Sequence, residues 1–479
     1  MLFHTYTFLI FSTILFAALA VFRGFTQRKI VLLAASYVFY MWWNPAFGAL
    51  VAVSTLVDYA IGLALNRTDE PRKRKALVAI SVSAQLGLLM YFKYAGFLAE
   101  NLFVISRLLG FEGPAPTFNI TLPIGISFYT FATLSYSIDI YRKQIPATRS
   151  LLDFALFIIF FPHLIAGPIV RAAQLIPQLE RPARLTINPS ILFLFLGGLI
   201  KKTLVADNVA VMADAVYANP EQWPSAMIWL ATIAFAVQIY CDFSGYSDMA
   251  IAIARALGYE LPVNFRHPYF AINPSDFWRR WHITLSLWLK DYLYIPLGGN
   301  RHGTLRTYAN LTLTMLLGGL WHGASWNFAL WGLWHGLLLV AHRAYRQIRE
   351  RWLGPLQEQS SFLSRTAAKL LMQYCVLISW IMFRVPDAEK MLIALRKFVF
   401  FDMNFSLAGI GAGSLFIFST TLLLSGFAAL HFWSYKHNGL HACLARMPLK
   451  TTMAACAAAG LALILLWPLQ EAPFIYFQF

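Results

Sequence analysis

Charged side chains are scarce in this sequence: 13% of its 479 residues are Asp, Glu, Lys or Arg, and 59% are hydrophobic. A soluble globular domain carries about 25% charged residues, so a soluble enzyme or binding domain is excluded. The formal net charge of +16 would suit a nucleic-acid partner, but the basic residues cluster in short loops between apolar runs. That placement is typical of topology signals and anionic-lipid contacts in a polytopic membrane protein.

Cysteine is also rare, and its four positions show no CxxC spacing. Neither a disulfide framework nor a zinc site is indicated, and these thiols are interpreted as small packing residues. The sequence lacks a GxSxG nucleophile elbow, an HExxH metal motif and paired catalytic carboxylates at a familiar spacing. Covalent serine chemistry and metal-dependent hydrolysis are thus unsupported, and we expect neither a metal nor a bound cofactor.

Apolar runs of spanning or near-spanning length follow one another along the chain. They predict an all-α polytopic membrane protein with roughly a dozen crossings, built as one membrane-embedded domain over residues 1–479. The catalytic core is expected at about 122–345 and a helical scaffold at about 365–479. The runs are Tyr6–Phe22, Ile30–Trp43, Ala46–Leu65, Ala76–Phe92, Leu122–Tyr141, Ile191–Ile200, Ala226–Ile239, Ile283–Leu297, Leu311–Ala341, Leu370–Phe383, Leu415–Phe432 and Met453–Trp467.

Basic loops predict the orientation of the chain. Residues 23–29, 66–75 and 142–149 are rich in Lys and Arg, so the positive-inside rule places all three loops in the cytoplasm. The N-terminus then lies outside, in the periplasm if the membrane is a bacterial inner membrane. This alternation requires that Phe97–Leu109 lies in the interface and does not cross. Prolines interrupt Leu151–Leu185, which predicts a broken or re-entrant helix there.

A histidine inside an apolar run is the most unusual feature of the sequence. His322 lies between Arg306 and Arg343, and no Asp, Glu, Lys or Arg lies between these two arginines. A charge in mid-bilayer costs roughly 2.5–3.5 kcal/mol, so the ring is predicted to rest neutral. A neutral imidazole can take and return a proton near neutral pH, which makes His322 the candidate general base.

The run that holds His322, Leu311–Ala341, is too long for one crossing of about 20 residues. We expect either a steep tilt or a break, with Gly318-Gly319 as the break. His322 and His335 would project from different faces of a continuous helix, so His335 is given a packing or supporting role. The ordinary alternative for each is a buried structural histidine.

A second histidine, His282, follows a polar segment. The sequence predicts a helix capped by Ser275, with Trp278 and His282 on one of its faces. An amphipathic interfacial helix explains the two adjacent arginines of this segment, but not a histidine that leads into an apolar run. We therefore predict His282 as a second donor that polarises a carbonyl or holds a developing oxyanion.

Two carboxylates follow an apolar span in Tyr240–Asp248. Gly245 favours a bend or unwound turn at this point. The segment is either a polar hinge that caps two helices or the wall of a pocket to which Asp242 and Asp248 contribute. Both interpretations remain open on the sequence alone.

A glycine-containing turn, Leu297–Thr304, resembles a phosphate-binding loop in the spacing of its glycines. It lacks the lysine and the preceding strand of that motif, so a basic cytoplasmic turn is the simpler interpretation. Asn300 and Arg301 are the candidates for contact with the phosphates of a donor.

Six motifs together resemble the membrane-bound O-acyltransferase (MBOAT) superfamily over nearly the whole chain. The resemblance implies a ring of helices, some broken or re-entrant, around a central tunnel that admits donor from the cytoplasm and acceptor from outside. It implies that His322 of the WHG motif is catalytic, and that His282 of the RWHI motif is the second polar residue. Trp281, Trp321, Asp242, Asp248 and His335 are candidates for tunnel or supporting positions. The motifs are Ala34–Tyr40, Leu122–Tyr129, Pro162–Pro168, Asp242–Met249, Phe277–Ile283 and Leu316–Gly323.

Within the superfamily the chain resembles the bacterial branch that acetylates exported polysaccharides such as alginate. That resemblance implies acetyl transfer from acetyl-CoA or another acyl thioester, with periplasmic acetylation proteins or the polysaccharide itself as partners. The branch also contains D-alanyl transfer proteins of teichoic acid synthesis, so D-alanyl or other acyl transfer to a cell-envelope polymer is an alternative. A transporter or flippase without chemistry is the alternative of another class, although the sequence shows no inverted repeat.

Overall fold

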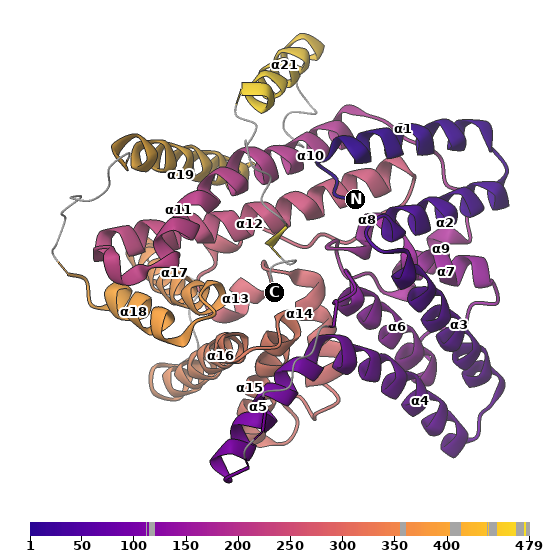
Figure 1. Cartoon of the computed structure of the whole chain (residues 1–479), viewed down its shortest axis with the longest axis horizontal. Helices are drawn as coiled ribbons and strands as arrows, with labels where there is room; N and C mark the ends of the chain where they lie inside the picture. The colour runs from indigo at the N-terminus through magenta and orange to yellow at the C-terminus, as the bar shows by residue number, and fades with distance from the viewer. Residues whose placement is uncertain are drawn as a thin grey trace. The chain divides into compact units, whose positions relative to one another are not determined.

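A computed structural model of the chain is helical throughout, with no strand among the residues that it describes (Figure 1). The predicted all-α fold class is therefore confirmed. Two compact units are present, one formed by Met1–Ile191 with Met249–Pro262 and the other by Leu192–Asp248 with Val263–Phe479. The described residues are 1–111, 113–114, 120–354, 361–402, 413–437, 439, 448–465 and 474–475.

The first unit contains most of the predicted N-terminal spans, each within a few residues of its expected limits. A π-helical turn, Met90–Tyr94, joins α4 to α5, so that Pro71–Leu108 is one apolar run of 38 residues. The interfacial placement of Phe97–Leu109 stays a prediction. The helices are α1 (Tyr6–Val21), α2 (Phe25–Met41), α3 (Pro45–Arg67), α4 (Pro71–Leu89), α5 (Ala95–Leu108), α6 (Ile126–Tyr141), α7 (Leu151–Ile159), α8 (Phe161–Leu164) and α9 (Ala172–Leu179).

The predicted break in Leu151–Leu185 is confirmed. The hydroxyl of Ser150 caps α7 by accepting the backbone N–H of Asp153 at 3.1 Å, and the helix ends at Ile159. Only a four-residue helix, α8, follows before Gly167-Pro168 interrupts the chain again. Three short helices thus replace one long one, because proline and the residue before it leave the helical geometry.

Two of the basic loops lie together at one end of the first unit. The Lys143 ammonium lies 2.7 Å from the Asp69 carboxylate, and this hydrogen-bonded partner holds the pKa of that carboxyl below its ordinary value. Arg74 donates to the backbone carbonyls of Leu65 and Ile140, which lie in the last turns of α3 and α6. The loops 66–75 and 142–149 therefore share one side, as the topology argument requires.

The second unit holds the candidate site. A π-helical turn, Lys201–Ala206, follows α10 directly, and α12 extends its last residues, from Met249, into the first unit. The helices are α10 (Pro189–Ile200), α11 (Asp207–Ala218), α12 (Ser225–Ala256), α13 (Pro274–Trp278), α14 (Ile283–Leu289), α15 (Gly303–His322), α16 (Trp326–Leu353), α17 (Phe362–Arg384), α18 (Ala388–Val399), α19 (Gly413–Lys436) and α21 (Leu449–Leu465).

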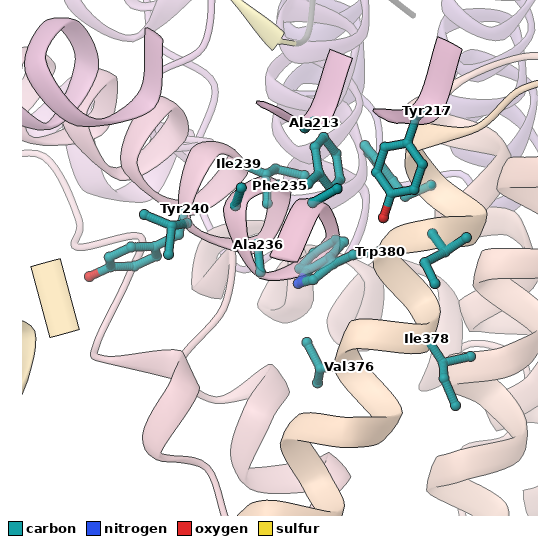
Figure 2. Packing of buried hydrophobic residues seen from close by; sticks show 14 of the residues in the cluster. Ala213, Tyr217, Phe235, Ala236, Ile239, Tyr240, Val376, Ile378 and Trp380 are labelled. Carbon is teal, nitrogen blue, oxygen red and sulfur yellow. The ribbon is translucent and has the colours of Figure 1, made fainter. Parts of the chain in front are cut away.

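An aromatic and aliphatic core joins α11, α12 and α17 inside this unit (Figure 2). Phe235 of α12 contacts Trp380 of α17 edge-on, with ring centroids 6.5 Å apart. Ala213 and Tyr217 come from α11, and the hydroxyl of Tyr217 is hydrogen-bonded to Thr232 at 2.8 Å. This packed core fixes the helices from which the polar groups of the site project.

The long run Leu311–Ala341 breaks, but not at the predicted place. α15 continues through Gly318-Gly319 and ends at His322, and α16 begins at Trp326. A Cβ on Gly319 would lie 2.9 Å from the Cα of Gly332, so these glycines let the two helices pack closely along their length. The prediction of a break at Gly318-Gly319 is therefore wrong, because the glycines admit a neighbouring backbone without ending the helix.

The predicted bend at Gly245 is also wrong. α12 runs without interruption from Ser225 to Ala256. A Cβ at Gly245 would lie 2.6 Å from the carbonyl oxygen of Gly198, so the glycine is needed for a close approach of α10. Because α12 is continuous here, the interpretation of Tyr240–Asp248 as a polar hinge between two helices is also wrong.

Six described segments are long and apolar enough to cross a bilayer, which supports a multi-pass membrane protein. The other predicted spans fall in shorter or more polar helices, and the total of about a dozen crossings stays a prediction. The six are Pro45–Arg67, Pro71–Leu108, Pro189–Ala218, Ser225–Ala256, Phe362–Arg384 and Phe416–Lys436.

Candidate functional site

The segment that carries His282 is not the single helix that the sequence predicts. Asn273, not Ser275, is the N-cap of α13, and its side chain accepts the backbone N–H of Asp276 at 2.8 Å. α13 ends at Trp278, and His282 is the N-cap of the next helix, α14. The prediction that Trp278 and His282 share one helix face is therefore wrong.

His282 adopts a backbone conformation that side-chain-bearing residues rarely use. Its φ is 42° and its ψ is 54°, in the left-handed region. The turn is held by the backbone N–H of Ile283, which donates to the carbonyl of Asn264 at 2.9 Å. The neighbouring N–H of Arg266 donates to the carbonyl of Arg280 at 2.9 Å. Strained backbone of this kind persists only where surrounding contacts determine it.

Asn264 fixes the orientation of the His282 ring. Its Oδ1 accepts from the Thr284 backbone N–H at 3.3 Å and from the Thr284 hydroxyl at 2.9 Å. Since a backbone N–H can only donate, this Asn264 atom is the carbonyl oxygen, and His282 Nδ1 at 3.1 Å must donate to it. In a neutral ring Nε2 is then a hydrogen-bond acceptor.

His322 lies beside His282. The two ring centroids are 6.3 Å apart, and both side chains are buried. His322 is the last residue of α15, where the helix stops and the chain turns towards α16. Its ring contacts those of Trp331 at 5.0 Å and Phe383 at 5.4 Å, both edge-on. The structure thus brings together, in one unit, two histidines separated by 39 intervening residues.

Aromatic side chains surround the histidine pair. Trp321 contacts the His322 ring at 5.0 Å and the His282 ring at 6.0 Å. Trp281 is buried and stacks on Phe277 with ring centroids 5.8 Å apart. These large rings shield the site and fix its geometry, but their roles in a tunnel stay predictions.

His335 is connected to the site through a tryptophan. Trp331 contacts the ring of His335 at 4.8 Å and the ring of His322 at 5.0 Å. His335 is fully buried and lies parallel to Phe277 at 5.8 Å. This placement suits the packing role that the sequence gives it.

Asp242 and Asp248 belong to two adjacent ion pairs. Lys202 Nζ lies 2.8 Å from a carboxylate oxygen of Asp242 and 2.8 Å from one of Asp207. Lys201 lies 2.5 Å from Asp248 in a more exposed pair. The next residue after Asp242, Phe243, contacts the His282 ring edge-on at 4.7 Å. The buried ion pair therefore supports the wall against which His282 rests.

Asn264, Lys201 and Lys202 were not among the sequence candidates. The two lysines directly follow the apolar run Ile191–Ile200, and two acids, Asp242 and Asp248, follow the next run, Ala226–Ile239. Opposite charges in neighbouring apolar spans are the signal that would have found this network, because intramembrane charges pair with one another. For Asn264 the sequence holds no comparable signal.

The proposed phosphate contacts lie on an exposed turn. Gly298 and Gly299 have φ of 108° and 56°, and the Asn310 amide donates to the carbonyl of Gly299 at 2.9 Å. Asn300 and Arg301 are exposed, and their contact with a donor stays a prediction. In the described part of the chain, no cluster of three or more His, Cys, Asp or Glu side chains could hold a metal.

The comparisons with known proteins agree on one family. Residues 38–383 match the family described as MBOAT, membrane-bound O-acyltransferase family. The chain is 43% identical over 405 residues to "Probable alginate O-acetylase AlgI" of Pseudomonas putida, covering 83% of this chain and 79% of that protein. It is 37% identical over 399 residues to "Peptidoglycan O-acetyltransferase" of Helicobacter pylori, covering 78% and 73%. A more distant relative, "Teichoic acid D-alanyltransferase" of Streptococcus thermophilus, is 28% identical over 251 residues, covering 48% and 60%.

Proposed function

Because the chain belongs to the membrane-bound O-acyltransferase family, we propose that it transfers an acetyl group from cytoplasmic acetyl-CoA to an exported, alginate-like polysaccharide. The protein is a multi-pass membrane O-acyltransferase, and the acetyl group is favoured by its similarity to O-acetylases. The polysaccharide receives the group in the periplasm, directly or through partner proteins. The membrane is a bacterial inner membrane, with the N-terminus of the chain on the periplasmic side.

The observation that carries the mechanism is the pair of buried histidine rings, 6.3 Å apart. His322, which the sequence predicts to rest neutral, accepts the proton of the acceptor hydroxyl as its oxygen attacks the thioester carbonyl. The C–O bond forms, the C–S bond breaks, and the proton passes from His322 to the leaving thiolate. No covalent acyl-enzyme is needed, since the acceptor attacks directly.

We propose a role for His282 that differs from the one that the sequence suggests. With Nδ1 donating to Asn264, Nε2 of a neutral ring accepts and cannot hold an oxyanion. We assign it to a hydrogen bond from a neighbouring hydroxyl of the acceptor, which orients the attacking oxygen towards the carbonyl. The donor role would require a protonated ring, which is costly in a buried aromatic setting.

The test of the function is transfer of label by the purified protein. With radiolabelled acetyl-CoA and polyuronate, alone and with candidate periplasmic partners, the label should reach the polysaccharide or a partner as an ester. Label that moves only from a D-alanyl donor would support the alternative within the family. Passage of a substrate across a liposome membrane with no donor present, and no ester formed, would support a transporter.

Asn264 provides a finer test of the site. Asn264→Leu should lower kcat about tenfold, because the His282 ring loses the acceptor that sets its tautomer. KM for acetyl-CoA should change little, since Asn264 contacts His282 and Thr284. The matched variant Asn264→Asp keeps the oxygen and should recover part of kcat. Equal losses in both variants would mean that Asn264 serves folding only.

A further inference from the structure

A basic cavity lies in the first unit, apart from the residues of the histidine site. Its volume is about 300 Å³, and its walls come from the end of α1, the start of α2, the segment Pro182–Leu185, and Leu257 with Tyr259. Arg23, Arg28 and Arg184 line it. The apolar part of the wall includes Leu19, Leu32, Leu257 and Tyr259, which are buried.

The three arginines keep their positive charge uncompensated. Arg23 Nε donates to the carbonyl of Ala20 at 3.0 Å, and an Arg28 guanidinium nitrogen donates to the carbonyl of Ala183 at 2.9 Å. Carbonyls position a guanidinium without neutralising it. Among the described residues no carboxylate forms an ion pair with Arg23, Arg28 or Arg184.

The fourth cation of the cavity behaves differently. Lys29 is buried and lies 2.5 Å from the Asp153 carboxylate, so this ion pair neutralises its charge. Arg28 Nε, in contrast, is a buried donor with no hydrogen-bond partner among the described residues. The cavity therefore offers a ligand a net positive charge and one hydrogen-bond donor, Arg28 Nε.

The surroundings of the cavity indicate an amphiphilic ligand. α2 begins here with Gly24 as its N-cap, and the first N–H groups of a helix favour an anion. Val21, Phe22 and Phe25 are exposed at the adjoining helix ends, where they suit contact with acyl chains. The bond between Arg28 and Ala183 also places residues 23–29 beside residues 182–185, and the positive-inside rule predicts residues 23–29 at the cytoplasmic surface of the membrane.

We propose that this cavity binds the phosphodiester headgroup of an anionic phospholipid. Three guanidinium groups match a phosphate, which arginine binds through paired N–H donors. A volume of about 300 Å³ lies at the lower end for a small-molecule pocket, which suits a headgroup better than a whole thioester donor. The inference does not depend on the proposed acetyl transfer, since it uses only the membrane setting and these residues.

The test compares lipid retention by two matched variants. The cavity variant is Arg23→Gln/Arg184→Gln, and the control variant is Arg72→Gln/Arg149→Gln. Each variant and the wild type are placed in nanodiscs of equal parts phosphatidylcholine and phosphatidylglycerol, then extracted for native mass spectrometry. All four substituted arginines are exposed, so the variants should fold, and gel filtration verifies this. Phosphatidylglycerol bound per chain should fall about tenfold or more in the cavity variant and stay near wild type in the control.

Other outcomes overturn the proposal. Equal retention in the two variants would mean that the lipid responds to overall charge and not to this cavity. Unchanged retention in the cavity variant, with a higher KM for acetyl-CoA, would assign the arginines to phosphates of the donor. Displacement of bound lipid by inorganic phosphate alone would show a site for free phosphate. With the proposal correct, KM for acetyl-CoA stays at its wild-type value.

Discussion

His322→Gln is expected to lower the rate of acetyl transfer by about 10² to 10⁴, the usual effect of losing a general base. Glutamine preserves much of the ring's volume and a hydrogen-bonding end, but it cannot take up a proton at neutral pH. The packing against Trp331 and Phe383 should therefore survive while the chemistry is lost. The measurement is kcat with radiolabelled acetyl-CoA, on protein shown to be monodisperse in detergent.

A second buried histidine supplies the control for this result. His163 lies in the first unit, where it is hydrogen-bonded to the carbonyl of Phe157 at 3.0 Å. His163→Gln removes a buried imidazole without touching the histidine pair, so transfer should stay within a few-fold of wild type. Equal losses in the His163 and His322 variants would indicate a general effect on folding. Wild-type transfer in His322→Gln would refute the base assignment.

Lys202→Met is expected to destabilise the protein by about 3–5 kcal/mol, because it leaves two buried carboxylates without their cation. Lys202 bridges Asp207 and Asp242, and the three side chains are at most 3% exposed. A loss of this size is a large fraction of a typical stability of about 5–15 kcal/mol. The measurement is the midpoint of thermal unfolding in detergent, followed by intrinsic fluorescence.

The adjacent lysine gives a matched comparison. Lys201→Met breaks the ion pair with Asp248. The side chains of Lys201 and Asp248 are 25% and 29% exposed, so the loss of stability should be nearer to about 1 kcal/mol. The triple variant Lys202→Met/Asp207→Asn/Asp242→Asn should recover part of the lost stability, since it removes the uncompensated charges. Equal melting of Lys202→Met and wild type would contradict the account of a buried bridge.

The helical spans could be predicted because hydropathy is a local property of the chain. α1 and α3, for example, begin within one residue of the predicted runs Tyr6–Phe22 and Ala46–Leu65. The predictions failed where a residue's effect depends on a neighbour in space. The sequence predicts a bend at Gly245 and a break at Gly318-Gly319, but Gly245 and Gly319 each admit another helix backbone.

The candidate site was predictable only where its residues stand out locally in the sequence. His322 and His282 stand out in sequence, because a polar ring in an apolar run requires an explanation. Asn264 does not, because an asparagine in a loop has many ordinary uses. Its importance arises only when the fold brings its side-chain oxygen to the ring of His282. The bridge from Lys202 to Asp242 has a signal in the sequence, opposite charges in neighbouring apolar segments, but only the fold shows which of these charges pair.

The most direct test of the central claim is a double-mutant cycle on the two histidines. The rate of label transfer from acetyl-CoA is measured for His322→Gln, His282→Phe and the double variant. If both rings act on one bound acceptor, the double variant should be about as slow as His322→Gln alone, because residues that act as a unit are strongly non-additive. Losses that simply multiply, or a double variant that still transfers acetyl at the wild-type rate, would contradict the claim.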